Sequence, residues 1–206
     1  MGLYGKFVFP RLLDWGLGKP ELNKYRRGAL EDAAGETLEI GFGTGLNLPH
    51  YPASVKRLIA IDSEIMLPDR VASRIDASGF PVQTMQVDAQ DRLPFEDGRF
   101  DTIVTTFVLC SITDPMVALE EMLRVLNPSG KYLFFEHGSA LDAKVQRWQN
   151  WLTPANRIIG CGCHLNRAID ELIEKAGFEI TQQHRFALPG APRVMGELYR
   201  GAARRG

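Results

Sequence analysis

The feature that most constrains the fold is a glycine-rich turn directly after a short apolar segment. Residues 38–47 read LEIGFGTGLN, so a strand-like segment leads into Gly41, Gly43 and Gly45. Glycine is needed where the backbone turns sharply or comes close to another group, because a Cβ would prevent both. Backbone N–H groups at such a turn can also receive an anionic group. The segment therefore indicates either a tight strand-to-helix turn or a loop that approaches a ligand.

Short apolar and β-branched segments alternate with helical patterns from residue 36 onward. Strands are predicted at residues 37–40, 57–61, 82–87, 102–106 and 132–135. This alternation is typical of βαβ units, in which helices cover both faces of a parallel sheet. Residues 178–186 and 194–199 read as two further strands joined by LPGAP, so the last strand is expected to run antiparallel to its neighbour. We predict a doubly wound, seven-stranded α/β sheet.

Two helices carry clear start and stop signals. The first follows Asp114 and Pro115, a cap and a first-position proline, and stops before NPSG at residues 127–130. The second is expected to be capped by Asn166 and to end at Gly177.

The length and charge of the chain narrow its class. The 206 residues fit a single domain, and the formal net charge is −1. The basic cluster at residues 200–205 reads as a solvated tail, so nucleic acid is not an expected partner. The sequence shows no secretory signal and no apolar run of about 18 residues, and its three cysteines are an odd number. A cytoplasmic, reducing compartment is therefore expected.

Two aspartates follow the second and third predicted strands. Asp62 lies 21 residues after Gly41, and Asp88 follows the third strand. The carboxyl ends of parallel strands share one edge of the sheet, where open α/β sheets bind ligands. A carboxylate at about this distance from a glycine turn contacts ribose hydroxyls in nucleotide-binding folds. A dinucleotide loop would carry glycine where this chain has Leu46, so binding through a pyrophosphate is disfavoured.

These residues resemble the class I S-adenosylmethionine-dependent methyltransferases. The resemblance rests on four stretches in the same order: LEIGFGTG at 38–45, Asp62 with Ser63 and Met66, Asp88-Ala89 with the following LPF and GRFD, and LRVLNPSG at 123–130. It implies a Rossmann-like fold and S-adenosylmethionine as the cofactor. Two departures concern helices: Pro49 leaves little room for a first helix, and Pro68 interrupts the second unless that helix starts there.

The resemblance also implies which residues contact the cofactor. They are Gly41, Gly43, Gly45, Asn47, Asp62, Ser63, Met66, Asp88, Ala89 and Thr106. The glycines would pass the backbone around the methionine part of the cofactor. Asp62 would hold the ribose hydroxyls, and Met66 would lie against the adenine. Asp88 would accept from the adenine amino group beside the N–H of Ala89, while the Thr106 carbonyl would lie near the methionine amine.

A narrower resemblance concerns the methyl acceptor. The stretches FVLCSI at 107–112, FEHG at 135–138 and GCHLNR at 162–167 are similar to the thiol methyltransferases of the methyltransferase-like group and their bacterial relatives. This resemblance implies a small, lipophilic alkyl thiol, although similar relatives use other acceptors. Methyl transfer from a sulfonium mainly requires the acceptor and the methyl group to be held together and aligned. A thiol with a pKa of about 8.5 needs only modest activation near pH 7.

His137 and His164 are the candidate general bases, and each reads equally as a hydrogen-bonded structural histidine. No metal site is predicted from Cys161, Cys163 and His164, because no second cluster completes four ligands. Cys110 reads as a small apolar wall residue rather than a nucleophile.

We interpret residues 1–206 as one methyltransferase domain. Its parts are a helical lid (1–35), a cofactor-binding core (36–136), an acceptor cap (137–166), and a last helix with the terminal hairpin (167–206).

Aromatic side chains concentrate in the lid and the cap. An apolar acceptor chamber is expected to be walled by Tyr4, Phe7, Phe9, Trp15, Trp148, Trp151 and Leu152. Within the lid, Phe7, Leu12 and Trp15 have near-helical spacing and are expected to pack over the strand ends. Contact of this segment with a membrane surface is the alternative and is not favoured.

The favoured function is therefore a methyltransferase that uses S-adenosylmethionine on a small, lipophilic acceptor and yields S-adenosylhomocysteine. The alternatives are a phospholipid or quinone methyltransferase at a membrane surface, a nicotinamide-dependent oxidoreductase and a non-catalytic cofactor-binding module. The sequence does not indicate the oligomeric state.

Overall fold

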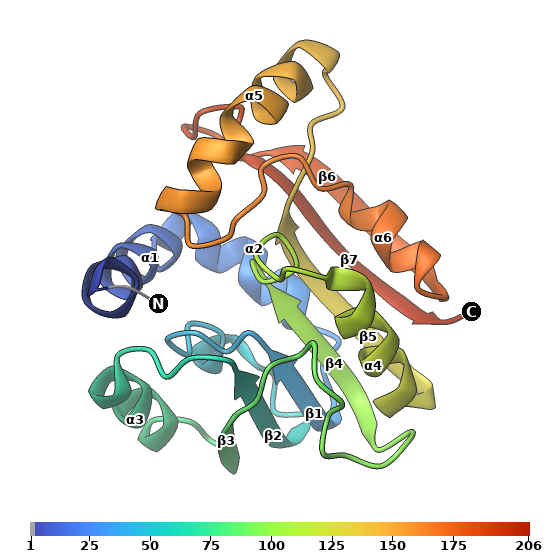
Figure 1. The fold of residues 1–206 in the computed structure, drawn as a ribbon. Helices are drawn as coiled ribbons and strands as arrows, with labels where there is room; N and C mark the ends of the chain where they lie inside the picture. The colour runs from blue at the N-terminus through green and yellow to red at the C-terminus, as the bar shows by residue number, and fades with distance from the viewer. Residues whose placement is uncertain (1–2) are drawn as a thin grey trace.

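The computed structural model describes residues 3–206 and contains one seven-stranded sheet (Figure 1). Its strands are β1 (Gly35–Ile40), β2 (Val55–Asp62), β3 (Val82–Gln86), β4 (Phe100–Thr106), β5 (Leu126–His137), β6 (Phe178–Ala187) and β7 (Glu197–Arg205). The spatial order is β3-β2-β1-β4-β5-β7-β6. The first five strands pair in parallel, whereas β7 runs antiparallel to both β5 and β6. The predicted seven-stranded α/β sheet with an antiparallel last strand is confirmed.

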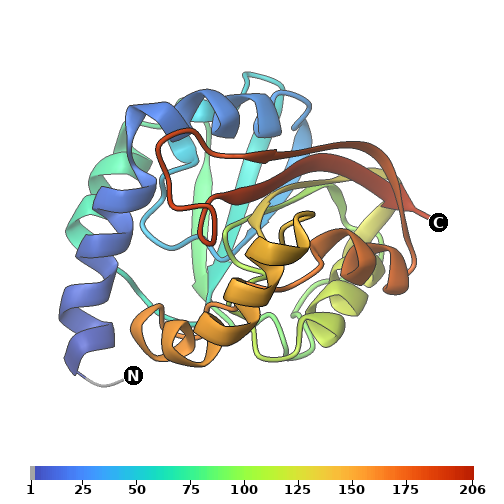
Figure 2. The ribbon, with the colours of Figure 1, turned by 90° about the horizontal axis from the view of Figure 1, so that it is seen from above.

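Helices cover both faces of this sheet, as expected of a doubly wound fold (Figure 2). They are α1 (Phe9–Leu17), α2 (Pro20–Leu30), α3 (Pro68–Asp76), α4 (Pro115–Val125), α5 (Ala143–Ile159) and α6 (Ile169–Lys175). Apolar residues of α4 and α6 form the main core with one face of the sheet. Residues of α2 and α3 pack with the other face in three smaller clusters. No helix within residues 3–206 has the length and apolar character needed to cross a membrane.

The two prolines shape the connections as the sequence predicts. After β1 the chain forms only a single 3-10 turn, η2 (Leu48–His50), with Pro49 inside it. Helix α3 begins at Pro68 itself, so this proline starts the helix rather than breaking it. The connection from β1 to β2 therefore contains no α-helix.

The start of α6 differs from the prediction. Asn166 does not cap the helix, which begins at Ile169 after Ala168 and has no side-chain cap. The Asn166 amide is used elsewhere: its Nδ2 donates to Asn150 Oδ1 at 2.8 Å, and its Oδ1 accepts from Thr153 Oγ1 at 3.2 Å. These bonds tie the segment before α6 to α5.

The interpretation of residues 200–205 as a solvated tail is wrong. They form most of β7, which starts at Glu197 rather than at residue 194 and continues to Arg205. Ala202 and Ala203 are buried between the neighbouring strands β5 and β6. Pairing on both sides of β7 overrides the low strand propensity of this short Arg- and Ala-rich segment.

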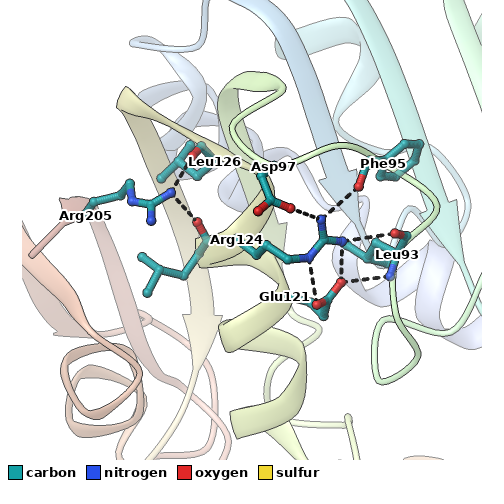
Figure 3. A network of polar contacts seen from close by, with 8 residues as sticks. Leu93, Phe95, Asp97, Glu121, Arg124, Leu126 and Arg205 are labelled. Carbon is teal, nitrogen blue, oxygen red and sulfur yellow. Dashed lines mark hydrogen bonds and ion pairs between the residues drawn. The ribbon is translucent and has the colours of Figure 1, made fainter.

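Arg124, in the LRVLNPSG stretch, is the centre of a network of polar contacts (Figure 3). Arg124 Nη1 donates to the Phe95 carbonyl at 2.9 Å and to Asp97 Oδ1 at 2.7 Å. Its other nitrogens donate to Leu93 O and to both carboxylate oxygens of Glu121, at 2.7–3.0 Å. Arg124 therefore fastens the loop between β3 and β4 to α4.

Candidate functional site

A cavity of about 300 Å³ opens where the carboxyl ends of β1, β2 and β4 meet. Nine of the ten residues expected to contact the cofactor line it: Gly41, Gly43, Asn47, Asp62, Ser63, Met66, Asp88, Ala89 and Thr106. Gly45 is not among the lining residues; its φ of +76° and the bond from its N–H to the Phe42 carbonyl shape the turn instead. The structure therefore brings together residues from four separate parts of the sequence.

The glycine turn leaves the backbone open toward the cavity. Gly41 has a φ of +73°, and a Cβ there would lie 2.2 Å from a methyl carbon of Val108. Gly43 has a φ of +57°, and the nearest atom to a Cβ there would be the Gly41 oxygen at 3.9 Å. A side chain at Gly43 would thus fill open space, while its backbone would be strained. This geometry suits close approach of a ligand to the turn.

Two carboxylates stand beside the turn. Asp62 Oδ2 accepts from the Gly43 N–H at 2.7 Å, and its Oδ1 accepts from the Glu64 N–H at 3.0 Å. Burial raises the pKa of Asp62 above its usual value. Asp88 accepts from the backbone N–H of Gln90 at 2.9 Å and from its side-chain amide at 3.1 Å. Both acceptors are thereby held in place at the ends of neighbouring strands.

A buried polar network lies under the glycine turn. The sequence predicted only two of its members, Asn47 and Thr106, as site residues. Asn47 Nδ2 donates to Glu39 Oε1 and to Thr106 Oγ1, both at 2.8 Å. Asn47 Oδ1 accepts from Arg26 Nη1 at 2.7 Å, and the Tyr51 hydroxyl donates to Glu39 Oε2 at 2.8 Å. Burial raises the pKa of Glu39 to about 7 and lowers that of Arg26 to about 10. A carboxyl and a guanidinium that share Asn47 as a hydrogen-bond partner therefore line the same cavity.

Sequence reasoning missed Glu39 and Arg26 as site residues. Glu39 could have been found from the sequence, because burying a single acidic residue inside an apolar strand costs free energy unless the carboxylate has a partner. Nothing in the sequence distinguishes Arg26 from the other cations of α2. In the structure both residues line the cavity, and Arg26 Nε has no hydrogen-bond partner among the described residues.

Helix α1 closes one side of the cavity and is fixed there by a buried carboxylate. Its inner face contributes Phe9, Leu13 and Leu17 to the cavity wall. Asp14 Oδ1 accepts from Thr44 Oγ1 at 2.6 Å and from Arg74 Nη1 at 2.7 Å, and Asp14 Oδ2 accepts from Arg70. Burial alone would raise the pKa of Asp14, but the bonds from Arg74 and Thr44 lower it. Asp14 therefore clamps α1 to the glycine turn and to α3.

The prediction of an aromatic acceptor chamber is wrong for most of the residues that it named. Phe7, Leu12 and Trp15 do not pack over the strand ends; each is at least half exposed, on the outer side of the N-terminal segment. Trp148 and Trp151 are also exposed, and Tyr4 and Leu152 do not line the cavity either. Among the seven predicted wall residues only Phe9 does. The apolar wall is formed instead by Leu13, Leu17, Phe107, Ile112 and Cys161.

Neither predicted base reaches the wall of this cavity in the described structure. His137 is buried, with its Nδ1 at 3.9 Å from Cys163 Sγ. His164 Nδ1 lies 3.2 Å from the Cys110 carbonyl, and burial lowers the pKa of His164.

The structure also forms a group that sequence reasoning missed. Side-chain atoms of Cys110, His137 and Cys163 lie within 4.8 Å of one another. The three residues come from separate segments, so spacing along the chain gave no signal. They supply three donor atoms, one fewer than a closed tetrahedral zinc site.

Comparison with known proteins gives consistent matches. A family model described as a methyltransferase domain matches residues 17–183. The chain is 33% identical over 193 residues to human thiol S-methyltransferase TMT1B, covering 87% of this chain and 77% of that protein. It is 29% identical over 183 residues to phosphatidylethanolamine N-methyltransferase of Cereibacter sphaeroides, covering 84% and 85%.

A solved structure has the same fold. The N-methyltransferase NodS from Bradyrhizobium japonicum, in complex with S-adenosyl-L-homocysteine, superposes with a TM-score of 0.68 and 20% sequence identity. The likeness covers 93% of this chain and 91% of NodS.

Proposed function

The chain belongs to the S-adenosylmethionine-dependent methyltransferases of class I, and from this premise we propose that it methylates the thiol group of a small, lipophilic acceptor. The observation that carries the proposal is the lining of the cavity, which combines four charged residues, here called the polar crevice, with an apolar wall of side chains from α1 and from residues 107–112. Relatives named thiol S-methyltransferases, at about one third identity, support the same choice.

The polar crevice fits the cofactor. The strand-end carboxylates Asp62 and Asp88 would hold the ribose hydroxyls and the adenine amino group. Glu39 would face the ammonium of the methionine part, and Arg26, whose Nε lacks a partner in the described structure, would face its carboxylate. The open backbone at Gly43 leaves space for this part of the cofactor. When bound, S-adenosylmethionine supplies a methyl group on a positively charged sulfur.

The acceptor end suits an uncharged, apolar molecule. The charged residues that line the cavity are Arg26, Glu39, Asp62 and Asp88, all of them in the crevice. Arg26 would already face the cofactor's carboxylate and is bonded to Asn47 and to the Leu17 carbonyl, so no cation of the cavity wall is left for a phosphate headgroup. The wall formed by α1 and residue 112 would bury an alkyl chain favourably. These features favour a lipophilic thiol over a phospholipid amine.

The chemistry demands little of the protein beyond positioning. The acceptor thiol would give its proton to solvent, and its sulfur would take the methyl group from the cofactor's sulfonium, which would leave as the neutral thioether S-adenosylhomocysteine. A thiol with a pKa of about 8.5 is partly ionised near pH 7, whereas an alcohol is not. Helix α1 excludes water from the reacting groups, and the fixed geometry supplies most of the rate enhancement. The roles of His137 and His164 as bases stay predictions from the sequence.

A matched acceptor series tests the proposal. Alkanethiols of increasing chain length are compared with alcohols and amines of the same length, with S-adenosylhomocysteine release as the readout. We expect thiols alone to be methylated, with KM falling as the chain lengthens. Turnover should rise with pH toward the pKa of each thiol. Preferential methylation of the amines, or of phosphatidylethanolamine, would overturn the proposal.

Two adjacent residues of α1 provide a matched pair of variants. Leu13→Ser alters the cavity wall and is expected to raise KM for long-chain thiols about tenfold, because apolar contact with the chain is lost. Leu12→Ser alters the exposed side of the same helix and is expected to leave KM unchanged in solution. Equal effects of the two substitutions would show that the inner face of α1 does not contact the acceptor.

A further inference from the structure

All three tryptophans of the chain lie exposed on two neighbouring helices. Trp15 of α1 is 71% exposed, and Trp148 and Trp151 of α5 are 58% and 71% exposed. Trp148 and Trp151 lie three residues apart and contact one another edge to face, with ring centroids 5.6 Å apart. Large aromatic side chains are costly to expose to water, and tryptophan is favoured where one side is apolar and the other is wet.

The N-terminal segment meets the end of α5. The Tyr4 hydroxyl, just before α1, donates to the carbonyl of Ile159 at the end of α5 at 2.9 Å. Figures 1 and 2 both show the N-terminal segment beside this end of α5. Phe7, Leu12 and Ile158 are further exposed apolar side chains of these two segments, and Ile158 is 78% exposed. We call the outer sides of residues 3–19 and of α5 the outer apolar face.

Basic residues outnumber acidic ones in the two segments that form this face. Residues 3–19 contain Lys6, Arg11 and Lys19, all exposed, and their one acidic residue is the buried, bonded Asp14. Helix α5 contains Lys144, Arg147 and Arg157 and no aspartate or glutamate, and Asp142 caps its start. The chain as a whole has a formal net charge of −1, so this excess of positive charge is local.

Two of these lysines lie against exposed aromatic rings. Lys6 Nζ lies 5.6 Å from the centroid of Phe7, and Lys19 Nζ lies 4.7 Å from that of Trp15. Such pairs keep the ammonium at the edge of an apolar surface, where long basic side chains can remain hydrated.

We propose that the outer apolar face docks on an anionic lipid surface. Apolar side chains would enter the boundary between headgroups and acyl chains, and the basic rim would contact the negative headgroups. A second copy of the chain is a poorer occupant, because a two-fold contact would place the two basic rims against each other. The inner face of α1 lines the cavity, so docking would hold the cavity beside a phase in which lipophilic acceptors dissolve.

The tryptophans provide a direct test, because every one of them lies on the proposed face. Fluorescence of the full chain is measured with vesicles of phosphatidylcholine alone and of phosphatidylcholine with phosphatidylglycerol, without cofactor or acceptor. We expect a blue shift of the emission, and quenching by brominated lipid, with the anionic vesicles at low salt. No shift with either vesicle, equal binding to both, or a dimer that buries the tryptophans without lipid would each overturn the proposal.

Matched variants locate the contact. Trp151→Ser and the double variant Lys6→Glu/Arg11→Glu are each expected to weaken binding to anionic vesicles at least about tenfold, measured by co-sedimentation. Val117→Ser on α4 and Lys56→Glu on β2 change an exposed aliphatic and an exposed basic residue outside the face, and are expected to bind like the wild type. Equal loss in the two sets would place the contact elsewhere. Because no acceptor is present, this result is independent of the proposed thiol specificity.

Discussion

The clamp formed by Asp14 can be weakened without changing its shape. Asp14→Asn keeps the size of the side chain but removes the negative charge that receives bonds from Arg74, Arg70 and Thr44. We expect α1 to open more often from the folded core, because its hold on the glycine turn and on α3 is reduced. The cavity would then lose a wall for part of the time, and cofactor affinity should fall modestly.

The size of the effect follows from the exposure of the partners. Hydrogen bonds to charged groups contribute roughly 1.5–3 kcal/mol each. The Arg70 side chain is 57% exposed, so solvent screens its share, whereas the Arg74 side chain is 26% exposed. The asparagine keeps one acceptor for Thr44. The free energy of opening α1 should therefore fall by about 2 kcal/mol, which corresponds to about thirtyfold faster amide exchange.

Hydrogen–deuterium exchange of the α1 amides at neutral pH measures this change. A matched control is Asp32→Asn, which removes a surface pair with Lys131 at 3.9 Å and should change nothing. Acid should act like the substitution. The pKa of Asp14 lies below its unfolded value of 3.8, so the clamp is complete above that pH and is lost as the pH falls through the folded-state pKa. Unchanged exchange in a folded Asp14→Asn variant would refute the reasoning.

Three further predictions concern the cofactor crevice and the core. Asp62→Ala should weaken S-adenosylmethionine binding in calorimetry by about 1–3 kcal/mol, because the ribose loses a charged acceptor; equal affinity would remove Asp62 from the site. Burial raises the pKa of Glu39 to about 7, so affinity for the cationic cofactor should rise between about pH 6 and pH 8, and Glu39→Gln should abolish that rise. A wild-type affinity independent of pH would contradict this. Arg124→Met should destabilise the fold by about 2–3 kcal/mol and lower Tm by about 5–10 °C without changing cofactor affinity, since its bonds fasten a loop.

The sheet was predictable because local signals and tertiary packing agree in it. Apolar β-branched segments form its parallel strands, and the position of Pro68 marks the start of α3. The glycine turn also adopts the positive φ values that only its residue type tolerates easily. In β7, by contrast, no β-branched residue follows Tyr199, and the strand exists because two neighbours pair with it.

The cavity was predictable only on its polar side. Strand ends converge by topology, so Asp62 and Asp88 could be placed from the sequence alone. Helix α1 is apolar on more than one side, and periodicity does not tell which side meets the core; Leu13 and Leu17 do so, whereas Leu12 and Trp15 stay exposed. The buried pairing of α2 with the network under the glycine turn likewise depends on tertiary packing and leaves no pattern in the sequence.

Transfer of an isotope-labelled methyl group tests the central claim most directly. The chain is incubated with S-adenosylmethionine carrying a trideuterated methyl group and with an alkanethiol that also bears a hydroxyl and an amine, and the product is located by tandem mass spectrometry. The account predicts the labelled methyl on sulfur alone, together with an equal amount of S-adenosylhomocysteine. Label on nitrogen or oxygen, or no transfer while the cofactor binds, would contradict it.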